Sequence, residues 1–274
     1  MGFGDQILKK RIDILLTEKN FFESRAKAQS MIMLGKILVN GQKVDKAGTL
    51  VDVDAEIKII GEEMPFVSRG GFKLKKALDV FQINLNGKIC ADIGASTGGF
   101  TDCMLQHGAK KIYAIDVGYG QLAWKLRNDE RVVNMERTNI RNVTRADFAD
   151  VLDFVSIDVA FISLDKVLPV AYEILSDAGE VVALIKPQFE AGRDKVGKKG
   201  VVRDKKIHAE VLNYVLNFAQ NLKFKIVGLD FSPIKGPEGN IEYLAFLTKN
   251  LDADEIFLDK KLASRSTRRM KLYS

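Results

Sequence analysis

One stretch, residues 88–120, limits the folds open to this chain more than any other. It begins with a short apolar run at residues 89–93 and a glycine-rich turn at residues 94–99, and continues with apolar residues at helical spacing until Gly108. A second apolar run ends at Asp116, 22 positions after the first glycine of the turn. This order predicts a strand, a turn, a helix and a second strand, which together form a βαβ unit with an acid at its far end.

The chemistry of such a unit favours an adenosine-bearing cofactor. Glycines let the backbone approach a ligand closely, the N–H groups at the start of a helix attract anions, and an acid about 20 residues further on can accept two ribose hydroxyls. The turn is not the G-x-G-x-x-G of nicotinamide enzymes, so a merely tight structural turn is the alternative.

The composition is that of a globular protein. The 274 residues suffice for one large domain and a small one, 46% of them are hydrophobic, and the mean hydropathy is −0.04. Cys90 and Cys103 form no CxxC pair, and His107 and His208 have no partners at metal-ligand spacing, so we expect buried thiols and no metal site. The chain has neither a signal-peptide core nor an apolar run of membrane-spanning length, which predicts a cytoplasmic protein that does not enter a membrane.

Basic charge gathers in three places along the chain, although the net charge is only +6. Residues 1–46 hold nine Lys or Arg against five Asp or Glu, residues 192–206 hold seven against two, and residues 259–274 hold six against one. Such clusters are typical of surfaces that meet a polyanion such as RNA. Solvated faces or frayed tails are the alternative for each cluster.

Residues 1–60 are expected to form a small domain. The spacing of apolar residues predicts a first helix marked by Leu8, Ile12, Leu15 and Leu16. Ser24 is the expected N-cap of a second helix, which Gly35 ends. The dipeptide Asn-Gly at residues 40–41 predicts a hairpin, and residues 51–60 predict one further strand.

The segment RIDILLTEKNFFESRAKAQSMIMLGKILVNGQKV resembles the small RNA-binding module shared by a ribosomal small-subunit protein, pseudouridine synthases and tyrosyl-tRNA synthetases. In that module the helix pair and the following turn lie against folded RNA. The resemblance implies that basic residues of this domain contact RNA, namely Lys9, Lys10, Arg11, Arg25, Lys27 and Lys36. A small structural appendage is the alternative.

Residues 61–65, GEEMP, are polar, contain a proline and lie where the sequence pattern changes, which predicts a linker over residues 61–68. A large domain then covers residues 69–250, and residues 251–274 form a basic C-terminal tail. Lys73 stands beside the apolar face of the first helix of the large domain, and Arg69, which precedes it, is a further expected RNA contact. That apolar face is marked by Leu74, Ala77, Leu78 and Phe81.

Strands and helices alternate through the rest of the chain. The strand candidates are residues 132–135, 154–159, 180–185, 225–229 and 243–248, and the clearest helices are residues 164–175 and 205–222. Together with the βαβ unit they predict a doubly wound α/β sheet of seven strands. Only residues 230–242 separate the last two strands, too few for a helical crossover, so we expect the last strand to be antiparallel. A parallel sheet with one reversed strand is the Rossmann-like architecture of S-adenosylmethionine-dependent methyltransferases, here with a small N-terminal α+β RNA-binding domain.

Charged residues lie at the ends of three of these strands. Asp158 ends one strand candidate, Lys186 ends the next, and Glu242 opens the last. Ligands of open α/β sheets bind outside the carboxyl ends of the strands, and a reversed strand begins at that same edge. We therefore expect these three residues to converge near the cofactor, with Lys73 joining them from the preceding helix. An ordinary surface charge is the alternative for each residue taken alone.

Six segments together resemble the TlyA family of rRNA methyltransferases, whose catalytic domain is similar to the FtsJ-type ribose 2′-O-methyltransferases: ADIGASTGGFT, AIDVGYGQLAWKLRND, ERTNIR, DVAFISL, LIKPQFEAG and GPEGNIEY. The resemblance covers nearly the whole chain. It implies that Lys73, Asp158, Lys186 and Glu242 form the catalytic tetrad of that class and that S-adenosylmethionine is the cofactor. It also implies methylation of a cytidine 2′-hydroxyl in ribosomal RNA, within ribosomal subunits or their precursors.

The resemblance implies cofactor contacts on the glycine-rich turn, on the acid that ends the second strand and on a segment that reaches the adenine. The expected residues are Gly94, Ala95, Ser96, Gly98, Phe100, Asp116, Thr138 and Asn139. We assign proton abstraction to Lys186, with Lys73 assisting and with Asp158 and Glu242 orienting the lysines. The sequence alone does not decide between the two lysines.

Residues 192–203, GRDKVGKKGVVR, are rich in glycine and basic residues and follow Lys186 closely. We expect a loop that is flexible without RNA and orders over the phosphate backbone through Lys195, Lys198 and Lys199. A solvated loop without a role is the alternative.

Two other functions stay open from the sequence. Some members of the TlyA family carry the name haemolysin, which suggests a lytic or secreted toxin, but the chain shows no signal, no membrane span and no long amphipathic helix. A non-catalytic RNA-binding factor for ribosome assembly would use the basic clusters and leave the tetrad unexplained. We expect a monomer, and the sequence does not fix which rRNA is modified or at how many cytidines.

Overall fold

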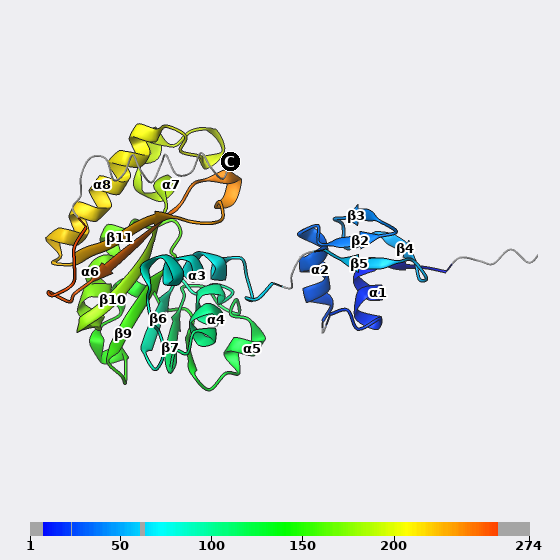
Figure 1. Cartoon of the computed structure of the whole chain (residues 1–274), viewed down its shortest axis with the longest axis horizontal. Coiled ribbons are helices and arrows are strands. Elements are labelled where there is room, and N and C mark those ends of the chain that lie inside the picture. Colours follow the sequence, from blue (N-terminus) through cyan, green and yellow to red (C-terminus); the bar gives the residue numbers. More distant parts are fainter. Residues whose placement is uncertain (1–7, 23, 61–63, 257–274) are drawn as a thin grey trace, which may run out of the picture. The chain divides into compact units, whose positions relative to one another are not determined.

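The computed structural model describes residues 8–22, 24–60 and 64–256. The chain forms two compact units, Met1–Pro65 and Phe66–Ser274, which are drawn in Figure 1.

The described residues of the smaller unit form two short helices and five short strands. Strand β1 pairs antiparallel with β4, and β2 lies between β3 and β5 in a second, antiparallel sheet. Apolar residues of both helices and of β2 and β4 form one core. The elements are β1 Lys9–Arg11, α1 Ile12–Glu18, α2 Arg25–Met33, β2 Ile37–Val39, β3 Gln42–Val44, β4 Leu50–Asp52 and β5 Ile57–Ile59.

Local chemistry sets the bounds of the second helix and the hairpin as predicted. The Ser24 hydroxyl accepts a hydrogen bond of 3.2 Å from the Lys27 N–H and caps α2, and Gly35 ends it with φ +64°. Asn40 and Gly41 both have positive φ, 50° and 78°, which is the conformation of a type I′ turn.

Two predictions for this unit are wrong. Leu8 belongs to no helix: residues 9–11 form a strand instead, because the Leu8 carbonyl accepts from the Val53 N–H at 3.0 Å and Lys9 pairs with Asp52. Residues 51–60 form parts of two strands rather than one. The Asp52 carboxylate accepts from the Asp54 N–H at 3.0 Å, and this local turn separates β4 from β5.

The larger unit is built on one sheet of seven strands in the order β11-β12-β10-β9-β6-β7-β8. The strands are β6 Ile89–Ile93, β7 Lys111–Ile115, β8 Val132–Met135, β9 Leu152–Ile157, β10 Leu175–Ile185, β11 Lys225–Phe231 and β12 Tyr243–Thr248. The helices are α3 Gly70–Phe81, α4 Gly99–Gln106, α5 Trp124–Arg127, α6 Leu168–Ile174, α7 Pro187–Glu190 and α8 Lys205–Asn221, with short 3₁₀ turns between them.

The predicted doubly wound sheet with one reversed strand is confirmed. Strands β6, β7, β8, β9 and β10 pair in parallel, whereas β12 is antiparallel to both of its neighbours, β10 and β11. A short connection between β11 and β12 allows only a reversal of the chain. The first residue of β12 therefore lies at the edge where the parallel strands end.

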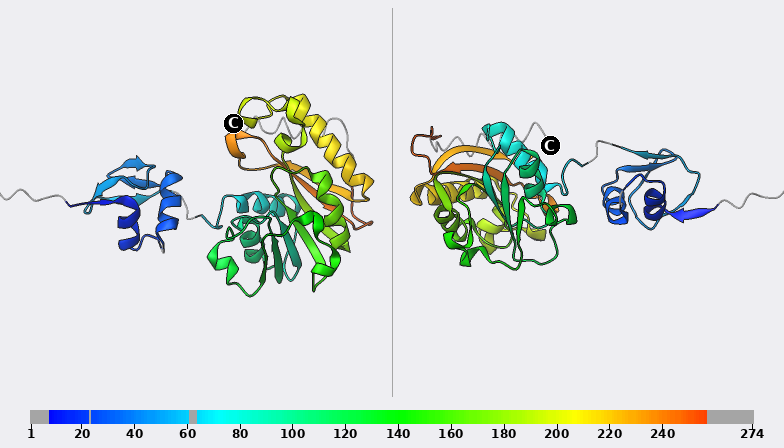
Figure 2. Two further views of the ribbon diagram at one scale, coloured as in Figure 1. Left: turned by 180° about the vertical axis from the view of Figure 1, so that it is seen from behind. Right: turned by 90° about the horizontal axis from the view of Figure 1, so that it is seen from below.

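Helices cover both faces of the sheet, and alternate residues of each strand serve the two sides (Figures 1 and 2). In β6, Cys90 packs into a core with residues of α3 and α4. Ala91 and Ile93 pack into the other core, with residues of α6 and α8. Within the described residues, no helix is both long enough and apolar enough to cross a bilayer.

The structure describes part of the predicted linker and part of the predicted C-terminal tail, at the two ends of the larger unit. Phe66 is buried in the core beside α3 and α4, and the Val67 N–H donates to the Asp102 carboxylate at 2.8 Å. The Ile256 N–H donates to the Ile226 carbonyl at 2.8 Å. The rest of the predicted basic tail, residues 257–274, and residues 61–63 of the linker lie outside the described residues.

Asp92 is a fully buried carboxyl in the central strand, β6. It accepts hydrogen bonds from the hydroxyls of Thr101 in α4, at 2.6 Å, and Ser156 in β9, at 3.1 Å. Burial raises the pKa of Asp92 from 3.8 to about 6, because these two hydrogen bonds offset the loss of hydration only in part. The carboxyl fixes the start of α4 to the sheet directly below the glycine-rich turn.

This carboxyl predicts a pH dependence of stability. Between about pH 4 and about pH 6 the folded protein keeps a proton on Asp92 that the unfolded chain releases, so the free energy of unfolding falls as the pH rises. The full decrease in the free energy of unfolding, reached above about pH 6, is on the order of 3 kcal/mol. Urea unfolding of the wild type and of Asp92→Asn across this range measures it. The variant should gain stability relative to the wild type as the pH rises, and a constant difference would contradict the assignment.

Candidate active site

The expected charged residues converge at one edge of the sheet. Asp158 directly follows β9, Lys186 directly follows β10, and Glu242 directly precedes the reversed strand β12. The register places Ile185 of β10 opposite Tyr243 of β12, so Lys186 and Glu242 leave the sheet side by side.

Three ion pairs connect the four members of the tetrad. Lys73 Nζ lies 2.7 Å from Glu242 Oε2 and 3.4 Å from Asp158 Oδ2. Lys186 Nζ lies 2.5 Å from Asp158 Oδ1. Asp158 thus joins the two lysines, and Glu242 contacts only Lys73 among them.

The tetrad is almost shielded from water. The exposed fraction of the side chain is 11% for each lysine, 18% for Asp158 and 1% for Glu242. Burying an unpaired charge costs several kcal/mol, so two positive and two negative charges can share this place only as a balanced group. Removing any one member leaves an uncompensated charge.

Lys73 reaches the tetrad because α3 and α4 cross closely. A Cβ on Gly99, the first residue of α4, would lie only 2.9 Å from the Gly71 backbone nitrogen in α3. The missing side chain lets the start of α3 lie against the start of α4. Lys73, one turn into α3, therefore lies next to the glycine-rich turn.

The glycine-rich turn presses against the backbone that carries the tetrad. Gly94 has φ +86°, and a Cβ there would lie 2.6 Å from the Asp158 carbonyl oxygen. The Asp158 N–H donates to the Ile93 carbonyl at 2.9 Å. The turn after β6 and the loop after β9 therefore form one continuous wall.

Asp116 closes the other side of the turn. Its Oδ2 accepts from the Ser96 N–H at 2.8 Å and its Oδ1 from the Gly118 N–H at 2.7 Å. The carboxylate is half-buried and holds the glycine-rich turn next to the loop after β7. It is available at this edge to accept hydrogen bonds from ribose hydroxyls.

Two cavities meet at this wall. The first, of about 380 Å³, is lined by all four tetrad residues, by residues of the glycine-rich turn and by Arg69, which directly precedes α3. The second, of about 460 Å³, is lined by Asp116 and by apolar side chains including Ile115, Val117 and Ile140. Both volumes are typical of small-molecule sites. They share Gly94, Ser96, Asp158 and Ala160, so the two cavities adjoin.

The residues present fit a nucleoside cofactor in the second cavity. The carboxylate of Asp116 matches a ribose, the apolar side chains match the faces of an adenine, and a glycine cradle leads toward the tetrad. Of the expected cofactor residues, seven line one or both cavities: Gly94, Ala95, Ser96, Phe100, Asp116, Thr138 and Asn139. Gly98 lines neither; with φ +95° it provides the bend before α4.

The expected RNA-binding residues of the larger unit lie in two places. Arg69 is exposed and lines the tetrad cavity. Lys195, Lys198 and Lys199 are exposed in the basic loop, where Lys195 pairs with Glu210 at 2.7 Å.

The basic loop of residues 192–203 is anchored at its far end. Val201 and Val202 are buried, and the Asn240 side chain accepts from the Val202 N–H at 3.2 Å and donates to the Gly200 carbonyl at 2.9 Å. The expected flexibility of the loop therefore stays a prediction that concerns its exposed half.

Other residues of the site were missed by the sequence analysis. Ser68 and Lys235 line the tetrad cavity, and Gln121 and Arg141 line the second one. Lys235 lies in the connection between β11 and β12, whose length we used only to predict strand direction. Its sequence, SPIKGPEGN, combines a lysine with two glycines and was the available signal.

Comparisons with known proteins agree with this geometry. Residues 66–249 match the family described as FtsJ-like methyltransferase, and residues 10–57 match the S4 domain. The Mycobacterium tuberculosis protein named 16S/23S rRNA (cytidine-2′-O)-methyltransferase TlyA is 43% identical over 245 residues, which are 89% of this chain and 91% of that protein.

The chain belongs to the TlyA family of FtsJ-like methyltransferases.

Other relatives of this TlyA-family protein carry a different name. Hemolysin A of Brachyspira hyodysenteriae is 47% identical over 237 residues, which are 86% of this chain and 98% of that protein. A solved structure of a hemolysin-named protein from Streptococcus thermophilus is 47% identical, has a TM-score of 0.76 and covers 97% of this chain and 98% of its own.

Membership confirms several expectations for this TlyA-family protein. It is an S-adenosylmethionine-dependent methyltransferase, and its small unit is an S4 domain. The resemblances of the N-terminal segment to a small RNA-binding module and of the whole chain to the TlyA family are therefore confirmed. The expected absence of a metal site stays a prediction: among the described residues, no group of three or more His, Cys, Asp or Glu is placed to hold a metal ion.

Asp116 gives the site its first test. Asp116→Ala should weaken S-adenosylmethionine binding by about tenfold or more, because the ribose hydroxyls lose a charged acceptor and the Ser96 and Gly118 N–H groups lose theirs. Isothermal titration calorimetry measures the affinity. Asp129→Ala is the matched control, since Asp129 is an acid of the same unit that pairs only locally, with Arg131 at 2.7 Å. Equal affinity of Asp116→Ala and the control would remove Asp116 from the cofactor site.

Proposed function

We propose that this protein transfers a methyl group from S-adenosylmethionine to the ribose 2′-hydroxyl of cytidine in ribosomal RNA. The observation that carries the proposal is the buried tetrad of two lysines and two carboxylates in a cavity that adjoins the cofactor cavity. The TlyA relative from Mycobacterium tuberculosis, whose name states this reaction, supports it.

The reaction sets two requirements on the protein. The bound cofactor supplies a methyl group that is already activated by its sulfonium, so the protein has to align the acceptor and remove its proton. The shared wall at Gly94 and Asp158 provides the alignment, because it brings the two cavities together without an intervening side chain.

Lys186 is our choice for the proton acceptor. Lys73 lies between two carboxylates, whereas the only carboxylate of the tetrad that Lys186 pairs with is Asp158. Lys186 therefore has fewer ion pairs to give up when its amine turns toward a ribose hydroxyl.

The other three residues hold the acceptor lysine and stabilise charge. Asp158 fixes Lys186 Nζ at 2.5 Å, and Glu242 fixes Lys73 Nζ at 2.7 Å. As the hydroxyl proton passes to Lys186, the Lys73 ammonium stabilises the negative charge that develops on the ribose oxygen. A balanced buried group of this kind has no role in a protein that only binds RNA, which favours an enzyme over an assembly factor.

The remaining charges suit an RNA substrate. Arg69 and Lys235 line the outer part of the tetrad cavity, where backbone phosphates would enter. The S4 domain carries Lys9, Arg25 and Lys27 on exposed positions. We further propose that the protein acts as a monomer in the cytoplasm, on ribosomal RNA within subunits or their precursors.

Lys186→Ala tests the chemistry. The variant should lose methyl transfer to ribosomal RNA by at least about 100-fold, because the proposed proton acceptor is removed, while S-adenosylmethionine and RNA still bind. Transfer of tritiated methyl groups to purified small and large ribosomal subunits measures it.

Lys166→Ala is its control, since Lys166 is an exposed lysine of the same unit that pairs with its neighbour Asp165. Turnover by Lys186→Ala at the control rate would exclude Lys186 as the base. Activity on only one of the two subunits would identify the substrate rRNA.

The basic loop has a separate test. Replacing Lys195, Lys198 and Lys199 together by Ala should weaken RNA binding and lower its salt dependence, because each lost phosphate contact reduces the slope of log K against log salt by about 1. The affinity for S-adenosylmethionine should stay at the wild-type value. Electrophoretic mobility shifts with ribosomal RNA at several salt concentrations measure the RNA affinity and its salt dependence. If the triple variant binds RNA like the wild type at every salt concentration, the loop does not contact the RNA backbone.

A further inference from the structure

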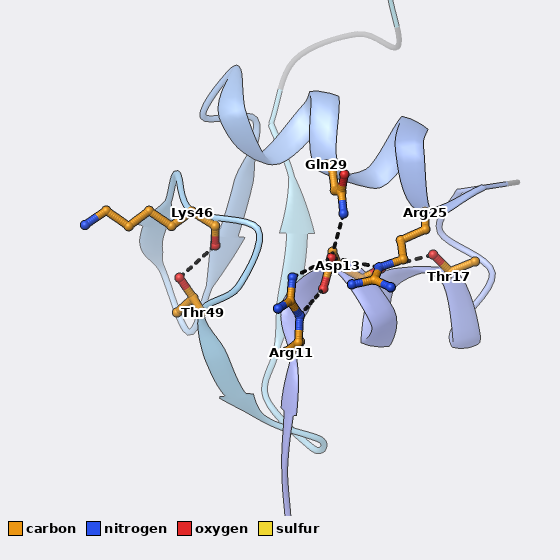
Figure 3. A network of polar contacts seen from close by, with 7 residues as sticks. All are labelled: Arg11, Asp13, Thr17, Arg25, Gln29, Lys46 and Thr49. Carbon is orange, nitrogen blue, oxygen red and sulfur yellow. Dashed lines mark hydrogen bonds and ion pairs between the residues drawn. The ribbon is translucent and has the colours of Figure 1, made fainter.

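A single buried carboxylate organises the basic residues of the S4 domain. Asp13, in the first turn of α1, has a side chain with 0% exposure, although it lies in the most basic part of this domain. Figure 3 shows that side chains from β1 and from α2 converge on it. Asp13 was not among the residues expected to take part in RNA binding, which were all basic.

Four side-chain hydrogen bonds reach the two oxygens of Asp13. Arg11 binds both oxygens in a bidentate manner, from Nε and Nη2, each at 3.0 Å. Arg25 Nε and Gln29 Nε2 add bonds of 2.9 and 2.8 Å to Oδ2. The Arg11 guanidinium accordingly holds the pKa of Asp13 well below its usual range, and the carboxylate stays charged throughout the physiological range.

The two arginines keep an outward side. Their side chains are 44% and 51% exposed, for Arg11 and Arg25 respectively, even though both bind a buried acid. Within the described part of the chain, Arg25 Nη1 and Nη2 and Arg11 Nη1 have no hydrogen-bond partner, so donors remain on both groups. Two positive charges on one negative charge leave a net charge of about +1 at this place.

We propose that Asp13 is a positioning residue that holds Arg11 and Arg25 as a rigid pair of guanidinium groups for a phosphate of the RNA backbone. The inference rests on the proposed function, which supplies the RNA. Fixing the two side chains before binding removes the rotamer entropy that each free arginine would otherwise lose, so the pair binds a phosphate more tightly than two mobile arginines. Gln29 donates a third hydrogen bond to Oδ2 and helps to keep the carboxylate in place.

A positioning role for Asp13 and a purely electrostatic role predict opposite changes in RNA affinity when Asp13 is replaced by Asn. Replacing an acid by its amide raises the net charge of the domain by one, and charge alone would then strengthen RNA binding. If Asp13 positions the arginines, the same replacement weakens binding. Glu56→Gln is the matched control, because Glu56 is an exposed acid of the same domain that pairs only with Lys58.

The experiment uses the full-length protein and fluorescently labelled transcripts of 16S and 23S ribosomal RNA. Asp13→Asn should bind about tenfold more weakly than the wild type, with a slope of log K against log salt smaller by about 1. Glu56→Gln should bind as tightly as the wild type or more tightly. Circular dichroism and the affinity for S-adenosylmethionine show whether both units remain folded.

Arg25→Lys provides a second test, since Asp13→Asn removes the acceptor of a buried network and can unfold the domain. Lysine keeps the charge but has one nitrogen, which cannot bind Asp13 and a phosphate in the same way. We expect Arg25→Lys to lose about as much affinity as Arg25→Ala. Wild-type affinity of Arg25→Lys, or tighter binding by a folded Asp13→Asn, would overturn the positioning role while leaving the methyltransferase proposal intact. If the wild type itself binds neither transcript, the RNA role of the domain falls, and this inference falls with it.

Discussion

Asp158 is the residue on which the site of the larger unit depends, since its carboxylate pairs with both lysines of the tetrad in a place that is nearly shielded from water. Charges in such a place are tolerated only when they balance, and here they come from four separate segments of the chain. Helix α3 supplies Lys73, the ends of β9 and β10 supply Asp158 and Lys186, and the start of β12 supplies Glu242. The sheet therefore has to fix all four segments together, and the reversed direction of β12 is what brings Glu242 to the common edge.

Most of the fold and the tetrad could be predicted from the sequence. Strands β6, β7 and β12 are buried on both faces and are nearly continuous apolar runs, so they were located to within a residue, as was the half-buried edge strand β8. Residues that end parallel strands share one edge whatever the details of packing, which is why Asp158 and Lys186 could be placed together. Lys73 was expected to join them from the preceding helix, but the close crossing at Gly99 that brings it there could not be predicted from spacing.

The predictions from sequence were wrong or incomplete in two situations. In one, strand pairing replaced an expected helix, and in the other, polar contacts formed between segments that are distant in the sequence. Residues 9–11 continue a helical pattern, yet pairing with β4 makes them a strand. Asp13 looks like any acid in the first turn of a helix, because its partners Arg25 and Gln29 are 12 and 16 residues away. The burial of Asp92 is equally hidden, since an acid within an apolar run carries no sign of the hydroxyls that satisfy it. Such networks are properties of the packed structure and not of any local pattern.

In the proposed function, the buried tetrad directs methyl transfer to a ribose oxygen. The most direct test supplies the purified protein with deuterium-labelled S-adenosylmethionine and ribosomal subunits, digests the RNA to nucleosides and locates the label by mass spectrometry. We expect the labelled product to be cytidine carrying the methyl group on its ribose, at O2′. A label on the base of any nucleoside, or no label on RNA from a protein that binds the cofactor, would contradict it.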